Sequence, residues 1–359
     1  MLIKFAVKNF RGFAERIEWD LSHPCNYSFN TYAVKDGVIK NEICMRTRSF
    51  RLFRSILSLV VCILGLMSCS EKDDGIPSNQ IHYTTKNNSV LELENLNSFG
   101  GAKIISNTYS PEDSVYIIEF STEITEIGEN SFYDCKSLTS VIIPPSVKKI
   151  GKSAFEDCKN LTSVNIPPLV TEIGIRAFRG CSSLTSISIP ASVKKIGKIV
   201  FLGCKSLTNI KVDSDNSVYD SREDCNAIIH TKSNTLITGC QNTIIPKSVI
   251  KIDNFAFGLC SSLTSISIPK SVKEIGIAAF SNCSSLKSIS IPPSVIVIGD
   301  CAFADCSSLT NITIPNSVMK IALAAFKGCS SLTTVHVSKN TEIADDAFEY
   351  CPNVKIERY

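Results

Sequence analysis

Apolar and polar positions recur along most of this chain with a period of 23 residues. The repeating mark is a phenylalanine, and an apolar residue stands six positions after each one. The phenylalanines of the series are Phe132, Phe155, Phe178, Phe201, Phe257, Phe280, Phe303, Phe326 and Phe348. A spacing of this length, repeated many times, is typical of a protein built by stacking short units of one kind.

The unit that reads CSSLTSISIPASVKKIGKIVF shows the pattern within one period. Leu184, Ile187 and Ile189 follow the L-x-x-L-x-L spacing of a leucine-rich repeat. Ser186 and Ser188 alternate with the two isoleucines, and this period of two predicts a half-buried strand. The isoleucines therefore face the core and the serines face outward.

The remainder of the unit predicts a return to the next strand. A proline follows the strand in six units and ends it, because proline cannot donate to a sheet ladder. A second apolar pair follows, such as Val193 and Ile196, and Gly197 turns the chain. We expect the step before each phenylalanine to close the coil as one 3₁₀-like turn. The sequence thus predicts a β-rich leucine-rich-repeat solenoid of about ten coils, with parallel strands on one face and short turns or 3₁₀ pieces on the other.

The series is interrupted once, by 56 residues between Phe201 and Phe257. The segment Asn209–Val212 still has the pattern of a repeat strand, although no proline ends it. Two apolar runs around Ser233-Asn234 then predict a β-hairpin. We therefore interpret residues 209–245, approximately, as an elaborated repeat.

Cysteines recur in register with the phenylalanines. Each stands three positions later, at Cys135, Cys158, Cys181, Cys204, Cys260, Cys283, Cys306, Cys329 and Cys351. Small, soft residues pointing the same way in every coil are poorly aimed at one another, so we expect packing thiols rather than disulfides. Cys225 and Cys240 flank the predicted hairpin and could either pair as a disulfide or remain two thiols.

The pattern S-L-T-S-I-x-I-P-x-S-V-x-x-I-G-x-x-A-F-x-x-C resembles the BspA-like leucine-rich repeats. The resemblance extends over residues 121–359, approximately. Such repeats are common in surface and secreted proteins of Gram-negative anaerobes. The resemblance implies a curved parallel solenoid with a role in adhesion or protein binding, and it implies no particular ligand.

Residues 45–68 have the features of a lipoprotein signal peptide. Four arginines precede an apolar run from Ile56 to Met67, which is too short to cross about 30 Å of hydrocarbon as a helix. The letters LMSC resemble a bacterial lipobox, which implies a lipid on Cys69. The acidic residues that follow resemble an export tag, which implies the outer face of the outer membrane.

A tether and a cap are expected between this anchor and the repeats. We assign residues 69–80 to the tether and residues 81–120 to an N-terminal cap that shields the first coil. The predicted strands of the cap are Ile81–Tyr83, Val90–Leu93 and Val115–Phe120.

Residues 1–44 fit neither the anchor nor the repeats. They resemble the opening strands of RecF-like or abortive-infection AAA ATPases. A phosphate-binding G-x-x-x-x-G-K-[ST] loop should follow, and the chain passes instead into the signal sequence. The one Gly-Lys-Ser in the chain, at Gly151, uses the recurring turn glycine of a repeat. We interpret the segment as a fusion remnant or a mis-assigned start, with an ATPase-related fusion protein as an alternative reading.

Charge and residue types narrow the function. Residues 1–68 carry a net charge of +5 and the whole chain +3, so the remainder carries about −2, and no nucleic-acid partner is expected. The histidines are scattered and no CxxC pair occurs, so we expect no metal and no cofactor. The recurring positions lack a nucleophile beside a base, and we expect no enzyme activity.

The expected function is protein binding at the cell surface, by a monomer anchored to the membrane through its lipid. Extracellular-matrix proteins or other cell-surface proteins are the expected partners, and a structural spacer without its own ligand is the alternative. The candidate binding residues on the outward strand face are Asn165, Ser188, Lys211, Ser267, Ser290, Thr313 and His336. The predicted hairpin offers a second set, Tyr219, Arg222 and His230.

Overall fold

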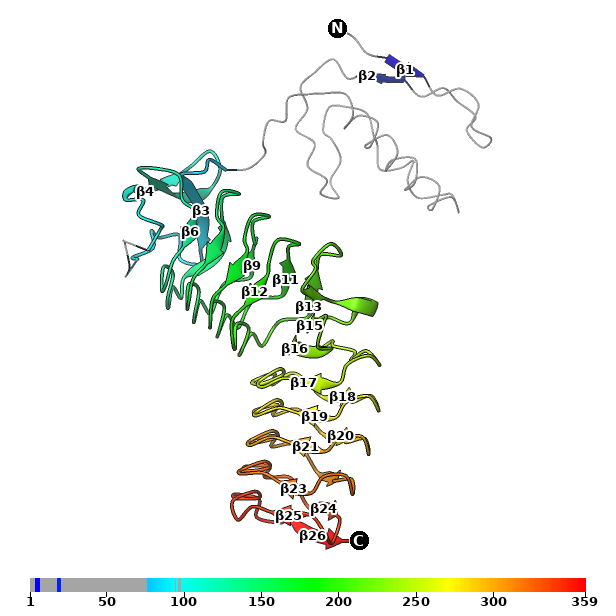
Figure 1. Ribbon diagram of the computed structural model, residues 1–359. Helices are drawn as coiled ribbons and strands as arrows, with labels where there is room; N and C mark the ends of the chain where they lie inside the picture. Colours follow the sequence, from blue (N-terminus) through cyan, green and yellow to red (C-terminus); the bar gives the residue numbers. More distant parts are fainter. Residues whose placement is uncertain (1–3, 7–17, 21–75, 94, 96–97) are drawn as a thin grey trace. The chain divides into compact units, whose positions relative to one another are not determined.

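The computed structural model describes residues 4–6, 18–20, 76–93, 95 and 98–359 (Figure 1). The chain divides into two units, residues 1–72 and 73–359. In the first unit, β1 (Lys4–Ala6) and β2 (Glu18–Asp20) form an antiparallel pair. The predicted signal peptide, the lipid site Cys69 and the first part of the tether lie outside the described residues.

The second unit is a β-solenoid of stacked coils, as the 23-residue period predicts (Figure 1). Each coil contributes one strand to a first column of parallel strands, in which equivalent residues of successive coils lie side by side; Ile187, for example, pairs with Ile210. The strands of this column are β7 (Leu138–Ile142), β9 (Ser163–Val164), β11 (Ser186–Ile189), β13 (Asn209–Val212), β18 (Ser265–Ser267), β20 (Ser288–Ser290), β22 (Asn311–Thr313), β24 (Thr334–Val337) and β26 (Lys355–Arg358).

A second column of parallel strands follows the first, after the proline in the coils that have one. Its members are only two residues long and pair in the same register, so that Ile150 lies beside Ile173 and Ile173 beside Ile196. They are β6 (Glu126–Ile127), β8 (Lys149–Ile150), β10 (Glu172–Ile173), β12 (Lys195–Ile196), β17 (Lys251–Ile252), β19 (Glu274–Ile275), β21 (Val297–Ile298), β23 (Lys320–Ile321) and β25 (Glu342–Ile343).

The turn around each repeat phenylalanine forms a third ladder, which we call the turn column. In the coil of Phe155, the N–H groups of Ser153, Phe155 and Asp157 donate to carbonyls of the next coil at 2.9, 2.7 and 2.7 Å. Ser153 and Asp157 have φ of +52° and +60°, and the equivalent positions of other coils are also left-handed. Hydrogen bonds of 3₁₀ type also close this turn, since the N–H of Glu156 donates to the carbonyl of Ser153 at 3.2 Å and that of Cys158 to the carbonyl of Phe155 at 3.3 Å. The expected closure is therefore 3₁₀-like in its hydrogen bonds but is no regular 3₁₀ helix; the 3₁₀ helix of the described chain is η2 (Arg222–Asp224), in the insertion.

The core runs along the stack between the columns. The repeat phenylalanines stack ring on ring, with centroids 5.0 Å apart for Phe132 and Phe155 and an interplanar angle of 3°. Each buried thiol of the cysteine column is also used; Cys181 donates to the carbonyl of Phe155 at 3.1 Å. Burial raises the pKa of the Cys181 thiol well above its ordinary value and that of Cys204 to about 12, so these two thiols stay protonated and unreactive at neutral pH.

An antiparallel cap covers the first coil. β3 (Gln80–Thr85) lies between β5 (Val115–Phe120) and the first repeat strand, β7, and β4 (Ile104–Ser110) completes the sheet. The predicted strand at Val90–Leu93 was wrong. Leu91 is instead buried in an irregular segment, where its N–H donates to the hydroxyl of Tyr83 at 3.0 Å.

The insertion contains the antiparallel hairpin expected around Ser233-Asn234. It consists of β15 (Ala227–His230) and β16 (Thr235–Gly239), with β14 (Tyr219–Asp220) on its outer side. β16 pairs in parallel with β17, so the hairpin begins the second half of the second column. No helix in the described part of the chain has the length and apolarity needed to span a bilayer.

Candidate protein-interaction surface

The first strand column brings the predicted outward residues together in two stretches of its outer surface, one on each side of the insertion. We call this surface the strand face and define it by Asn165, Ser188, Lys211, Ser267, Ser290, Thr313 and His336. Ser188 lies beside Lys211, Ser267 beside Ser290 and Thr313 beside His336. The strands point these side chains outward because the alternate isoleucines, such as Ile187, are buried.

Four hydroxyls of the strand face are exposed and have no hydrogen-bond partner among the described residues: those of Ser188, Ser267, Ser290 and Thr313. The hydroxyl of Thr310, just before the strand of Thr313, differs, since it donates to the carbonyl of Lys287 at 3.5 Å. The four hydroxyls are therefore available to donate to and accept from a second molecule.

Asn165 and His336 are instead engaged with the neighbouring coil. The Asn165 side chain accepts a hydrogen bond from the N–H of Ile143 at 2.8 Å and donates to its carbonyl at 3.0 Å. The His336 ring lies 3.0 Å from the Glu357 carboxylate. The Asn165 side chain thus makes the kind of hydrogen bonds between two coils that the strand backbone makes elsewhere, and it is also exposed.

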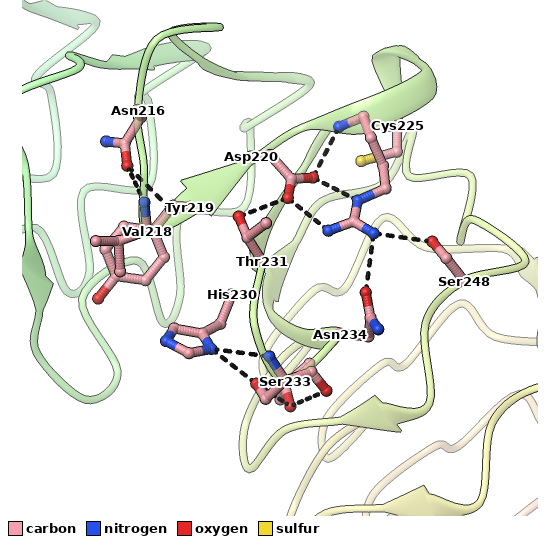
Figure 2. Close-up of polar contacts among 12 residues, drawn as sticks. Asn216, Val218, Tyr219, Asp220, Cys225, His230, Thr231, Ser233, Asn234 and Ser248 are labelled. Carbon is pink, nitrogen blue, oxygen red and sulfur yellow. Dashed lines mark hydrogen bonds and ion pairs between the residues drawn. The ribbon is translucent and has the colours of Figure 1, made fainter.

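The hairpin residues are not gathered on the surface as expected (Figure 2). Tyr219 is buried, and its hydroxyl accepts a hydrogen bond from the N–H of Ile196 at 3.0 Å. The expectation that Tyr219 is a surface residue was therefore wrong. Its backbone is held by the buried Asn216, whose side-chain oxygen accepts from the N–H of Tyr219 at 2.9 Å.

Arg222 links the parts of the insertion to one another (Figure 2). Its guanidinium donates to both oxygens of Asp220, at 2.7 and 2.6 Å, and also to Asn234 at 2.9 Å and Ser248 at 3.2 Å. Burial opposes ionisation of Asp220, but its hydrogen bonds with Arg222 and Thr231 hold the pKa of that carboxyl below its ordinary value. These hydrogen bonds hold the Arg222 guanidinium within the insertion, so few of its N–H groups can donate to a ligand.

His230 lies at the tip of the hairpin and is half-buried. Its Nδ1 accepts a hydrogen bond from the N–H of Ser233 at 3.3 Å and lies 2.8 Å from the Ser233 hydroxyl. Its ring meets that of Tyr219 edge-on, with centroids 5.8 Å apart. Of the three hairpin candidates, His230 is the one whose ring edge reaches the surface at the turn.

Sequence reasoning missed an exposed apolar set beside the second column. Ile250, Ile296 and Met319 occupy the same position of their coils, one residue after the buried valine, and are 43%, 56% and 62% exposed. In the coil between those of Ile250 and Ile296, this position is held by Lys273. In the remaining coils the position is usually held by a polar residue. Comparison of this one position across the repeats would have revealed the departure from the pattern.

The family of the chain follows from comparison with known sequences. Residues 102–225 and 234–355 match the model of the BspA type leucine-rich repeat region, with six copies, and so cover more than half of the chain. The chain belongs to this family. The gap between the two BspA-type segments falls in the hairpin, and the resemblance of residues 1–44 to ATPases is not shown. None of the curated proteins matches this chain.

Two solved structures are similar to this chain. A leucine-rich repeat protein from Eubacterium ventriosum is 25% identical, with a TM-score of 0.57, and the match covers 67% of this chain and 71% of that one. A leucine-rich cell surface protein from Faecalibacterium prausnitzii is 23% identical, with a TM-score of 0.44, and the match covers 75% of this chain and 95% of that one.

Proposed function

We propose that this BspA-type protein is a cell-surface lipoprotein that binds other proteins through its strand face. The lipid on Cys69 anchors it to the outer face of the outer membrane, and the solenoid acts as a monomer that presents the strand face to extracellular-matrix proteins or to proteins of other cells. The role contains no catalytic step.

The single observation that carries this proposal is the series of exposed hydroxyls without partners, from Ser188 to Thr313. Ser267, Ser290 and Thr313 lie in three successive coils, about 4.8 Å apart from one coil to the next, so that a partner can make the same weak contact several times. The exposed apolar set of Ile250, Ile296 and Met319 adds a second surface of the kind that monomeric proteins seldom leave uncovered unless it contacts a partner.

The binding test uses the protein against a panel of purified extracellular-matrix and bacterial surface proteins. The triple variant Ser188→Glu, Ser267→Glu, Ser290→Glu should weaken any specific binding at least about tenfold, because each step of about 1.4 kcal/mol is tenfold in affinity. The control variant Ser262→Glu, Ser330→Glu changes two exposed serines outside the strand face and should bind normally.

Equal binding by the two variants would remove the strand face from the proposal, and a failure to bind any panel member would favour the spacer alternative. The anchor is tested separately with Cys69→Ala. This variant should keep the folded solenoid but lose its partition into detergent, because one lipidated cysteine is the attachment point proposed. Unchanged partition would show that the LMSC segment is no lipobox.

A further inference from the structure

The turn column is broken at one place inside the stack. In each of the other internal coils, three N–H groups donate to the next coil. They belong to the repeat phenylalanine and to the residues two positions before and two positions after it. In the coil of Phe178, the N–H groups of Arg176, Phe178 and Gly180 donate to carbonyls of the next coil at 3.2, 3.1 and 2.8 Å. The equivalent N–H groups of the following coil, those of Ile199, Phe201 and Gly203, have no partner among the described residues. The last coil, at Phe348, ends the column in the same way.

The insertion causes the break. After β12, the chain leaves for β13 and the hairpin, and the second column resumes only with β16 and β17 (Figure 1). On the far side, Gly239 stands where a coil would place its phenylalanine, since its N–H donates to the carbonyl of Ala256 at 2.9 Å. The carbonyls of Asn254 and Gly258, which flank Ala256, accept no hydrogen bond within the described chain.

The phenylalanine stack is broken at the same point. Phe178 and Phe201 stack with centroids 5.6 Å apart, and Phe257 and Phe280 stack at 5.0 Å, but the described chain has no ring contact between Phe201 and Phe257. A side chain at Gly239 would collide with the Phe257 ring. The Phe257 ring therefore occupies the space beside Gly239 where a side chain would lie, and the Phe201 ring has no stacked aromatic neighbour on this side among the described residues.

A cavity of about 330 Å³ occupies the break, which we call the turn gap. Ile199, Phe201 and Gly203 line one wall, and Phe255 and Leu259 line the other. Pockets for ligands start at about this volume, which suits one large side chain with its backbone rather than a folded element. Phe255 is 39% exposed at the turn gap, although bulky residues rarely adopt its left-handed φ of +60°.

Charge differs between the two walls. Lys198 is exposed beside Ile199, and Asp253 lies on the other wall beside Asn254. A peptide in the alternating right- and left-handed conformation of a repeat turn carries its carbonyls on one edge, as the turn with Ile277, Ala279 and Ser281 does, and it therefore matches a wall of donors. A ligand without a backbone of this kind, such as a sugar, would leave the regular spacing of the N–H groups unused.

We propose that the turn gap binds a peptide segment of a partner protein in the conformation of a repeat turn. Its carbonyls accept hydrogen bonds from the N–H groups of Ile199, Phe201 and Gly203, as the carbonyls of the next coil do elsewhere in the turn column. One aromatic side chain of the segment enters the cavity and covers the face of Phe201. This site lies in the turn column, and it goes beyond the strand-face function proposed above and does not depend on it.

The chain itself supplies a suitable probe. Residues 276–283, GIAAFSNC, form a turn that is hydrogen-bonded to the coils on both of its sides. The carbonyls of Ile277, Ala279 and Ser281 accept hydrogen bonds from the preceding coil. The N–H groups of Ala278, Phe280 and Asn282 donate to the following coil. The synthetic octapeptide GIAAFSNS, acetylated and amidated, offers the same backbone and ring without a reactive thiol. Hydrogen exchange of the full chain, read by mass spectrometry, reports on the peptide spanning residues 196–204.

Without the octapeptide, three amides in segment 196–204 should exchange on the order of tenfold faster than their equivalents in segment 173–181, because a hydrogen bond is missing at each. Saturation with the octapeptide should slow these three amides to the rate of segment 173–181. An octapeptide with alanine in place of phenylalanine should bind at least about tenfold more weakly, since the ring contributes most of the buried apolar area.

A matched pair of variants locates the site. Gly258→Leu adds a side chain toward Leu202, at the turn gap, and should abolish protection of segment 196–204. Ser281→Leu makes the same change at the same position of the next coil and should leave protection intact. A melting temperature equal to that of the unmodified protein verifies that Gly258→Leu is folded.

Three results would overturn the proposal. The first is slow exchange of all three amides before any octapeptide is added, because the turn gap would then be closed. The second is protection confined to segment 343–351 at the end of the column or to the strand face. The third is no protection at millimolar octapeptide. Failure here leaves the strand-face test unaffected, since the two experiments read different residues.

Discussion

The thiol of Cys283 donates a hydrogen bond to the carbonyl of Phe257, in the preceding coil, at 3.2 Å. The same bond joins Cys306 to Phe280 and Cys329 to Phe303, at 3.2 and 3.1 Å. The cysteine column is therefore more than a filler of small volume. A thiol must be protonated to donate, and burial raises the pKa of the Cys283 thiol well above its ordinary value.

This bond predicts a loss of stability at alkaline pH. Burial raises the pKa of Cys204 to about 12, from 9.0 for an ordinary thiol. Unfolding above pH 9 therefore releases protons, so the stabilisation is complete below pH 9 and decreases as pH rises toward 12. The urea midpoint should fall between pH 8 and pH 10.5, and the fall should be smaller in Cys204→Ser. Equal falls in both proteins would show that this thiol does not ionise on unfolding.

The phenylalanine stack predicts a large difference between inward and outward residues. Phe280 is fully buried between Phe257 and Phe303, with centroids 5.0 and 5.3 Å away. Phe280→Ala should lower the free energy of unfolding by about 3–5 kcal/mol, the usual cost of the cavity that remains. Ser267→Ala, on the strand face, should change it by less than about 0.5 kcal/mol. Similar costs in denaturant titrations would mean that the two faces are assigned wrongly.

The turn glycines predict a steric limit on the distance between coils. A β-carbon added at Gly174 would lie 2.5 Å from the carbonyl carbon of Gly151, in the coil before. Gly174→Ala should therefore destabilise the protein by about 1–3 kcal/mol, the typical cost of overpacking. At Gly258 the nearest atom is the end of the flexible Leu202 side chain, so Gly258→Ala should cost much less. Equal melting temperatures for the two variants would contradict this account.

Arg222 predicts the stability of the hairpin relative to the rest of the solenoid. Arg222→Ala removes the ties to Asp220, Asn234 and Ser248 together, so amide exchange in β15 and β16 should accelerate while the coils around Phe303 stay protected. Arg222→Lys keeps the charge without the two-pronged geometry and should give an intermediate rate. Uniform acceleration throughout the chain would indicate that the hairpin opens only with global unfolding.

The inward and outward faces of the first column could be predicted because a period of two leaves a strand few alternatives. Ile187 and Ile189 are 3% and 1% exposed, and Ser188 between them is exposed. The family comparison and the structure confirm the solenoid and its 23-residue period. The second column could not be predicted, because strands of two residues are too short to show an alternation.

The turns and the insertion were less predictable, since their conformations depend on partners one coil away. Ile199, Ala278 and Ala324 are left-handed, although none of these residue types favours that conformation; their backbone is fixed by the stacked coils. Tyr219 was placed on the surface as part of the predicted hairpin. Its hydroxyl instead accepts a hydrogen bond from the N–H of Ile196, 23 residues earlier, which no local pattern indicates.

Neighbouring coils pair in the same register, and we call each such contact between two coils a join. This shared register has a consequence for how the gene can change in length. The joins from β8 to β10 and from β10 to β12 pair equivalent residues, so each coil presents one surface to its predecessor and a matching one to its successor. An in-frame duplication or deletion of 23 residues between two ordinary coils recreates a join that already exists. The solenoid can therefore grow or shrink by recombination without inventing a new interface, whereas the hairpin and its turn gap would be gained or lost as a whole.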